Sequence, residues 1–378
     1  MKKISYYLLM SALCMQLFAQ APNGSKSLLN TQTARTLDAG RFEVRTDMNF
    51  FTKLADFVGN QTLKPADFKA VNYWLVNSSA VLTFGVVDHF DITVIPGLYQ
   101  DTHTPNEYNL PDDIRVFLKA GSFDFANRSM YAGFSIGTRF PLGEDHNYPF
   151  TYYASGAVEY GINGMLSYYL DPYLPDRSFN AHLTLGWWNY NEAGTEVYKD
   201  KFATVNSNAL NYALGFQYPT DLFDFQLEVF GLAYLTQPDE FVYARENWTY
   251  VTPSIRYKPF SWFGFNLGVD IRVSPDEDTS NGINKFENVG LPNYTAWKAH
   301  LGFEITLLPL TDAVGNTPAA VQQKQFNKRV EFFQEIIEER EKSENIKEEL
   351  DKLQDEREAA EQELEELKQI LEDEGGDL

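Results

Sequence analysis

Apolar and polar side chains alternate with a period of two from Gly40 to about Leu310, and this is the repeat of a β-strand. In one clear stretch, one face carries Ile114, Val116, Leu118 and Ala120, and the other carries Arg115, Phe117 and Lys119. The same alternation fills 263–274 and 295–308. Each long segment therefore has one apolar face and one polar face that includes charged residues.

About twelve such segments are present, and most reach the length of roughly 9 to 11 residues that a tilted membrane strand needs. They are approximately 41–51, 74–86, 90–100, 114–124, 129–141, 156–170, 179–190, 207–218, 223–235, 247–258, 263–274 and 295–308. Tight connections at 87–89, 125–128, 219–222 and 259–262 alternate with long polar loops near 58–73, 101–113, 142–155, 191–206, 236–246 and 275–294. Short turns at one end and long loops at the other are typical of outer-membrane barrels.

Strand length and closure favour a membrane barrel over a soluble β-sandwich. Sandwich strands are usually about 5 or 6 residues long, and lipid cannot satisfy an open sheet edge, so a spanning sheet closes on itself. Aromatic residues near the segment ends suggest interfacial girdles: Trp74, Tyr168, Tyr169, Trp187, Trp188, Tyr218, Trp248 and Trp262. We expect an all-β transmembrane antiparallel meander barrel of about 12 strands over 41–310, in contact with the lipid of a Gram-negative outer membrane.

The N-terminus has the parts of a secretory signal peptide over 1–20: the basic pair Lys2 and Lys3, an apolar stretch, and a small-residue exit at Ala19. The single cysteine, Cys14, lies inside it, so the predicted mature chain has no thiol for disulfides or metal binding. The polar stretch 21–40 is predicted to be an extended periplasmic lead-in. Its residues Pro22 to Ala39 could supply a small plug, although the sequence itself does not show one.

The last strand segment contains a pattern that resembles the β-signal read by the barrel-assembly machinery: His300, then Gly302, Ile305 and Leu307. It departs from the common signal in being internal and in ending on Leu307. The signal-peptide exit and the stretch from Thr33 to Val44 resemble outer-membrane proteins of Bacteroidota. More loosely, they are similar to transporter-like barrels of the meta-pathway of phenol degradation. These resemblances imply an outer-membrane barrel assembled by that machinery.

If the apolar faces meet lipid, the opposite faces line a lumen with charges of both signs. The candidate lumen-lining residues are Arg115, Lys119, Arg139, Glu159, Glu228, Arg256, Asp270, Arg272, Lys298 and Glu304. Such a lining suits a hydrated channel, but the same charges can pair across a narrow barrel and close it. A barrel of about twelve strands lies between filled small barrels and open porins, so size does not decide between these alternatives.

The sequence offers little support for an enzyme, a metal site or nucleic-acid binding. Five scattered histidines include no His-x-x-x-His pair, and His182 is followed by Leu183 and Thr184 rather than by the His-x-Ser motif of outer-membrane phospholipases. The acidic stretch 275–287 places no glycine and glutamate in the register of a calcium loop. The formal net charge of −22 argues against nucleic acid. We therefore expect no catalytic residues, no metal and no cofactor.

After a linker at 311–320, the residues 321–374 change to a three-four spacing that predicts a helix. Its candidate coiled-coil seam comprises Ile336, Ile346, Leu350, Leu353, Ala360, Leu364, Leu367 and Leu371, with breaks at Glu339, Ser343 and Arg357. Since an even number of strands returns the chain to its starting side, this helix is expected in the periplasm. It can form a homo-oligomer, dock on a helical periplasmic protein, or remain a single charged helix.

Two functions follow from these features. The first is a passive channel or transporter for small solutes, with the tail organising oligomers or binding a partner. The second is a non-conducting structural or accessory barrel of an envelope or secretion complex, in which the tail is the functional element. A continuous polar lumen favours the first, and a plugged or charge-paired lumen favours the second.

Overall fold

The computed structural model describes residues 26–55, 71–102, 113–143, 150–281 and 293–308, apart from the single positions 173, 176 and 199, and parts of 330–362. The predicted signal peptide and the linker lie outside the described residues. The chain divides into two compact units, Met1–Asn316 and Thr317–Leu378. Among the described residues, no helix is both long and apolar enough to cross a membrane.

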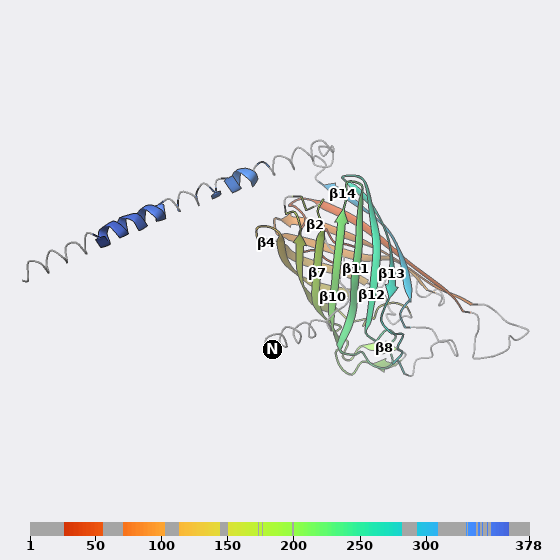
Figure 1. Cartoon of the computed structure of the whole chain (residues 1–378). Coiled ribbons are helices and arrows are strands. Elements are labelled where there is room, and N and C mark those ends of the chain that lie inside the picture. Colours follow the sequence, from red (N-terminus) through yellow and green to blue (C-terminus); the bar gives the residue numbers. More distant parts are fainter. Residues whose placement is uncertain are drawn as a thin grey trace, which may run out of the picture. The chain divides into compact units, whose positions relative to one another are not determined.

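The first unit is a closed antiparallel barrel of twelve strands (Figure 1). The strands are β1 (Phe42–Ala55), β2 (Val71–Val87), β3 (Phe90–Thr102), β4 (Asp113–Phe125), β5 (Met130–Pro141), β6 (Glu159–Tyr169), β7 (Asn180–Asn189), β10 (Asn208–Pro219), β11 (Phe223–Thr236), β12 (Trp248–Phe260), β13 (Phe263–Arg272) and β14 (Trp297–Leu308). Each strand pairs with its neighbour in sequence, and β1 pairs with β14 to close the barrel. The predicted fold class and strand count are confirmed for this unit.

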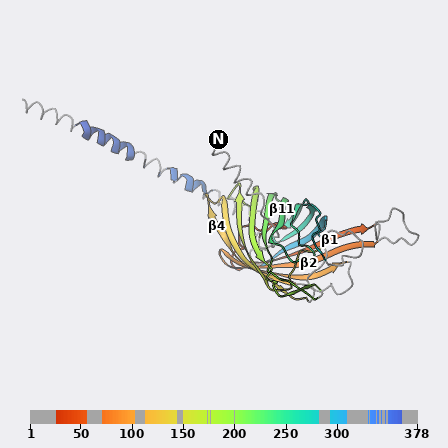
Figure 2. The same cartoon turned by 90° about the horizontal axis from the view of Figure 1, so that it is seen from below.

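The connections differ strongly between the two ends of the barrel. One end has short turns, such as the one between β2 and β3, where His89 adopts a φ of 69°. The other end carries the long loops, and the loop between β7 and β10 contains a small hairpin of β8 (Glu196–Tyr198) and β9 (Lys201–Phe202). The β1 and β2 strands pair with each other as far as Ala55 and Val71, beyond the last β1 contact to β14 at Phe50, so their hairpin projects past the neighbouring strands (Figure 2).

Side chains alternate between the two faces of the wall as the sequence predicted. The outer face exposes large apolar side chains, including Phe134 at 53%, Ile136 at 54%, Ile162 at 56% and Leu267 at 49%. The inner face buries polar and charged groups, including Lys119, Glu159, Glu228 and Asp270. An apolar outside and a polar inside are the reverse of a soluble barrel and typical of a barrel that spans a membrane.

Three of the predicted girdle aromatics face inward instead of toward lipid. Trp188, Trp248 and Tyr169 are 8%, 1% and 4% exposed, whereas Tyr218 and Trp262 are 60% and 41% exposed. In the pairs Tyr168–Tyr169 and Trp187–Trp188, neighbouring side chains point to opposite faces, so only one of each pair can face lipid. Trp248 falls on the inward face of β12 together with Tyr250 and Thr252. The prediction of a girdle was therefore wrong for these three residues.

The second unit is helical over 332–337 and 349–362. Of the predicted seam, Ile346, Leu350 and Leu353 are exposed on it, and Leu364, Leu367 and Leu371 lie outside the described residues. The coiled coil remains a prediction.

Candidate functional site: the occupied lumen

The ten predicted lumen-lining residues lie on the inner face of the barrel wall or at its rim. Six are at most 9% exposed: Lys119, Glu159, Glu228, Arg256, Asp270 and Lys298. The side chains of Arg115, Arg139, Arg272 and Glu304 are 30%, 12%, 8% and 22% exposed. Many of these groups contact the chain itself rather than an open channel.

The N-terminal segment, residues 26–39, lies inside the barrel as far as Leu37 and reaches the rim at Asp38 and Ala39. Thr31 and Ala34 are 0% exposed, and Leu28 and Leu37 are 1% exposed. From residue 27 to residue 37, the segment contacts β12, β11, β7, β6, β4 and β3 in turn. This is their order around the barrel, so the segment follows the inner wall round before it enters β1. It belongs to the stretch 21–40, which the sequence predicted to be an extended lead-in and which did not itself indicate a plug.

Glu228 on β11 holds the segment through three consecutive backbone amides. The amides of Leu29, Asn30 and Thr31 donate to its carboxylate at 3.0, 2.8 and 2.6 Å. Glu228 is 0% exposed, and a buried carboxylate requires such donors because its desolvation is otherwise costly. This contact fixes one turn of the segment against the wall.

Two arginines hold the carbonyl oxygens immediately before that turn. The guanidinium of Arg45 donates to the carbonyls of Ser27 and Leu28 at 3.0 and 3.1 Å. Arg256 donates to the same Ser27 carbonyl at 3.0 Å. Cationic groups thus face carbonyl oxygens, and the anionic Glu228 faces amides.

Further along the segment, four more wall side chains form hydrogen bonds to its backbone. Thr184 donates to the carbonyl of residue 32 at 2.9 Å, and Lys119 donates to that of residue 35 at 2.6 Å. The amide of residue 34 donates to Ser167 at 2.8 Å, and that of residue 37 donates to Asp91 at 3.2 Å. The whole segment is therefore bound through polar contacts to the wall.

Inward-facing glycines make room for the segment. A Cβ on Gly121 would lie 2.2 Å from the carbonyl oxygen of Ala34, and one on Gly85 would lie 2.2 Å from that of Asp38. On the opposite wall, a Cβ on Gly215 or Gly268 would lie 2.4 or 2.5 Å from the side chain of Leu28 or Leu29. Each glycine occupies an inward position of its strand, where the alternation otherwise places a side chain. These glycines are the sequence signal that points to a chain inside the lumen.

An ionic cluster lies beside the segment. His300 faces Asp270 at 2.8 Å and Asp47 at 3.3 Å. Lys298 approaches Asp270 at 3.4 Å, and Thr252 donates to it at 2.6 Å. Asn30 of the segment donates to the same carboxylate at 3.4 Å. Opposite charges are paired here across neighbouring strands.

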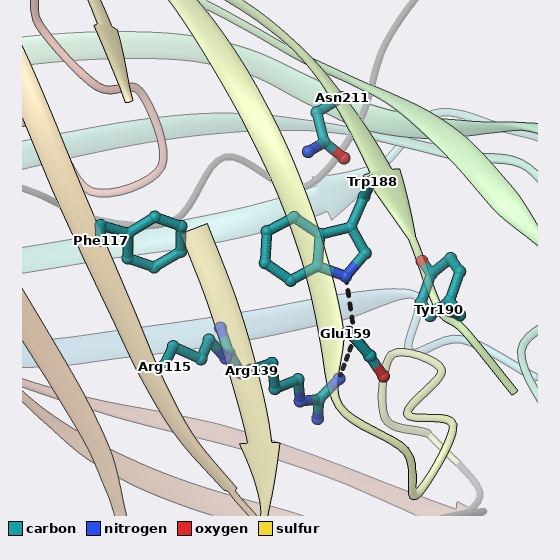
Figure 3. A pocket seen from close by; sticks show the side chains of 7 residues that line it. All are labelled: Arg115, Phe117, Arg139, Glu159, Trp188, Tyr190 and Asn211. Carbon is teal, nitrogen blue, oxygen red and sulfur yellow. Dashed lines mark hydrogen bonds and ion pairs between the residues drawn. The ribbon is translucent and has the colours of Figure 1, made fainter. Parts of the chain in front are cut away.

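A second ionic cluster lies nearer the long loops (Figure 3). Arg139 pairs with Asp113, and with Glu159 at 3.7 Å, while the indole of Trp188 donates to Glu159 at 2.8 Å. Arg115 contacts Asp113 at 3.5 Å. A cavity of about 20 Å³ is lined by Arg115, Phe117, Arg139, Glu159, Trp188, Tyr190 and Asn211. That volume has room for about one water molecule, not for an organic solute.

The long-loop end is filled by a mainly aromatic cluster, the loop-side cluster, which includes Phe230, Trp248, Tyr250, Tyr190 and Tyr294. The Tyr294 hydroxyl donates to the carbonyls of Ala244 and Glu246 at 2.5 and 2.7 Å, which ties two long loops together. Within the described residues, the lumen is thus occupied at two levels, by the N-terminal segment and by this cluster.

The predicted assembly-signal residues lie on β14. Gly302 pairs with Asp47 of β1 and Asn266 of β13, and a Cβ there would lie 2.2 Å from the Thr46 carbonyl oxygen. Ile305 pairs with Val44 in the seam that closes the barrel. Recognition of these residues by an assembly machinery remains a prediction. Among the described residues, no group of three or more acidic, histidine or cysteine side chains could hold a metal ion.

No protein-family model and no curated protein matches this chain. Several solved barrels are similar in structure. An outer-membrane channel from Pseudomonas putida F1 is 9% identical, with 74% of this chain and 100% of that chain covered and a TM-score of 0.44. The NanC porin is 11% identical, with 70% and 100% covered and a TM-score of 0.40. The toluene transporter TodX of Pseudomonas putida is 10% identical, with 77% and 98% covered and a TM-score of 0.31. Identities and TM-scores this low give no guide to a solute.

Proposed function

We propose that this chain is an outer-membrane channel for small solutes and that its N-terminal segment is the gate, in the closed position. The observation that carries the proposal is the polar attachment of residues 26–39 to the inner wall of an apolar-surfaced barrel. Water can replace hydrogen bonds of this kind when the segment leaves, whereas a lumen filled by apolar wall side chains would have nothing to release. The segment also precedes β1 and is not part of the strand ladder, so it can leave without breaking the pairing of the strands.

Location and orientation form part of this proposal. The exposed apolar belt is suited to lipid, and the closed strand ladder leaves no open edge in the bilayer. With the short turns in the periplasm, the tail after β14 extends into the periplasm, where it self-associates or binds a helical protein. The resemblance to outer-membrane proteins of Bacteroidota and to barrels of phenol degradation is consistent with this location. Membership of either group remains a prediction.

The competing function is a non-conducting structural or accessory barrel. The double occupancy of the lumen favours it, because the loop-side cluster buries Trp248 and Tyr250 to 1% exposure in addition to the segment. If that cluster is permanent, the lumen stays blocked at the long-loop end after the segment is removed.

Single-channel conductance in planar bilayers separates the two functions. Three refolded proteins are compared: the mature chain, the chain without residues 22–39, and the chain truncated after Leu310. A gated channel predicts rare openings in the first and third proteins and steady conductance in the second. No conductance from the folded second protein would exclude the gate and favour the structural barrel.

A further inference from the structure

The N-terminal segment is bound through its backbone along its whole length. Wall side chains form hydrogen bonds to its amides and carbonyls from residue 27 to residue 37. Other hydrogen bonds involve its own side chains. Every peptide presents backbone groups, so the backbone part of this recognition does not depend on sequence.

The wall has the charge pattern that an extended backbone requires. Glu228 and Asp91 accept from amides, whereas Arg45, Arg256 and Lys119 donate to carbonyls. Any main chain buried in the lumen needs partners for its amides and carbonyls, and this wall supplies several of them from charged side chains. Hydrogen bonds to charged groups are among the stronger contacts available to a neutral ligand.

Two of the inward glycines admit main chain, whereas Gly215 and Gly268 lie against the side chains of Leu28 and Leu29. Gly121 and Gly85 face carbonyl oxygens of the segment, at 2.2 Å from the position of a Cβ. They admit main chain at close approach, and any L-peptide has main chain there. The side chains of the segment between Ser27 and Leu37 are small or uncharged, apart from Arg35, whose guanidinium lies 5.9 Å from the ring centre of Tyr131 and 5.6 Å from that of Tyr169.

We propose that the inner wall from β12 to β3, together with Arg45 of β1 and Gly85 of β2, is a binding track for the backbone of a short extended peptide, and that the N-terminal segment is its tethered ligand. The solute class that this track selects is therefore peptides, with weak preference for sequence. The inference rests on the proposed function, since a peptide reaches the track only after the segment has left. Tethering gives the segment a high effective concentration, which keeps the lumen closed until a peptide competes.

The test begins from the full chain, folded with its segment in place. A protease site is inserted between Ala39 and Gly40, which are exposed at the rim, and the folded protein is cut and washed in urea that leaves the barrel intact. A fluorescent peptide with the sequence of residues 26–38 is then added, and binding is followed by anisotropy. The chain without residues 22–39 serves as a second receptor that needs no cutting.

Two altered peptides distinguish backbone recognition from sequence recognition. A peptide N-methylated at the residues equivalent to Leu29, Asn30 and Thr31 keeps its side chains but loses the three donors to Glu228. It should bind on the order of 100-fold more weakly. A peptide of the same composition in scrambled order should bind within about tenfold of the original, because its backbone is unchanged.

The Glu228→Gln receptor is the matched control for methylation. If methylation acts by removing the bonds to Glu228, its penalty should shrink at least tenfold in this receptor, whereas a purely steric penalty should persist. Equal binding of the methylated and unmethylated peptides, or loss of all binding by the scrambled peptide, would overturn the backbone track.

Conductance measurements on the same samples distinguish the gated-channel proposal from the peptide-track proposal. A cut chain that conducts and is blocked by added peptide supports both. A cut chain that conducts but neither binds peptide nor is blocked by it retains the channel and overturns the track. A cut chain that binds peptide but does not conduct retains the binding site and overturns the channel, and with it the idea of peptides as solutes.

Discussion

At the scale of single residues, Glu228 is the strongest attachment point between wall and segment. It is fully buried and accepts from three amides within 3.0 Å. Glu228→Gln removes the negative charge and leaves one acceptor oxygen, while its new amide group faces donors. Since a hydrogen bond to a charged group contributes about 1.5 to 3 kcal/mol, we expect the open fraction of the full-length channel to rise roughly 10- to 100-fold. Single-channel recordings measure this fraction.

The matched control for this change is Glu159→Gln. Glu159 is also buried on the inner face, but its described partners are Ser155, Trp188 and Arg139 rather than the segment. Its substitution should leave the open fraction nearly unchanged. An equal rise in both variants would mean that lost charge, not lost segment binding, opens the lumen.

A second residue-scale prediction concerns Gly121. In Gly121→Ala, the new Cβ meets the Ala34 carbonyl oxygen at 2.2 Å, and this atom belongs to backbone, so the segment must move. The bonds from the Ser122 amide to Ala34 and from the Thr36 amide to the Ser122 hydroxyl would weaken. We expect trypsin to cut after Arg35 on the order of ten times faster, because cleavage follows local opening.

Gly164→Ala is the control for that experiment, since the nearest atom to its Cβ would be 3.7 Å away. It should leave the rate of cleavage after Arg35 at the wild-type value. If Gly121→Ala also leaves this rate unchanged, the glycine does not position the segment.

At the scale of elements, the strands were predictable and the lumen contents were only partly so. The two-residue period fixed the strand number and the inner and outer faces, because a shift by one residue would turn every polar side chain toward lipid. The same period, applied to the adjacent Trp187 and Trp188, would have assigned one of them to the interior. The inward glycines, such as Gly121, also carry a signal, but only the folded wall shows which segment fills the space they leave.

The loop between β7 and β10 contains a titratable group outside the spanning strands. Burial raises the pKa of Glu192, although its carboxylate accepts from the amide of Ser207 at 2.9 Å and from its hydroxyl. The pKa of Glu192 is higher in the folded loop than in the unfolded chain, where it is near 4.5. The loop is therefore most stable at pH below the unfolded pKa and loses stability as pH rises through the folded pKa. Glu192→Gln removes this titration.

We therefore expect the amides of residues 191–207 to exchange more slowly in Glu192→Gln than in the wild type at pH above the folded pKa, by a few-fold. After correction for the pH dependence of intrinsic amide exchange, the difference in exchange rate between the two proteins should shrink as pH falls. Hydrogen–deuterium exchange of this loop measures the effect. The same pH dependence in both proteins would show that Glu192 does not control the loop.

At the scale of the whole molecule, the gate and the tail belong to different units. The segment is bound by wall residues between Arg45 and Asp270, all within Met1–Asn316. Truncation after Leu310 should therefore leave the barrel folded and its gate closed. Heat-dependent migration on gels tests whether the truncated barrel is folded, and single-channel recordings test whether its gate is closed. Steady conductance from the truncated barrel would contradict a closed gate.

In the tail, an apolar seam and a high net charge have opposite effects on self-association. Ile346, Leu350 and Leu353 are 63%, 53% and 64% exposed, and residues 321–378 contain 20 acidic and nine basic side chains. Burial of such a seam favours self-association, while like charges oppose it over a screening length of about 10 Å at 0.1 M salt. We expect the mass of the detergent-solubilised full chain, measured by light scattering, to rise with salt, and that of the chain truncated after Leu310 to stay constant. A full chain that remains monomeric at every salt concentration would contradict self-association and leave a helical partner protein as the better explanation of the seam.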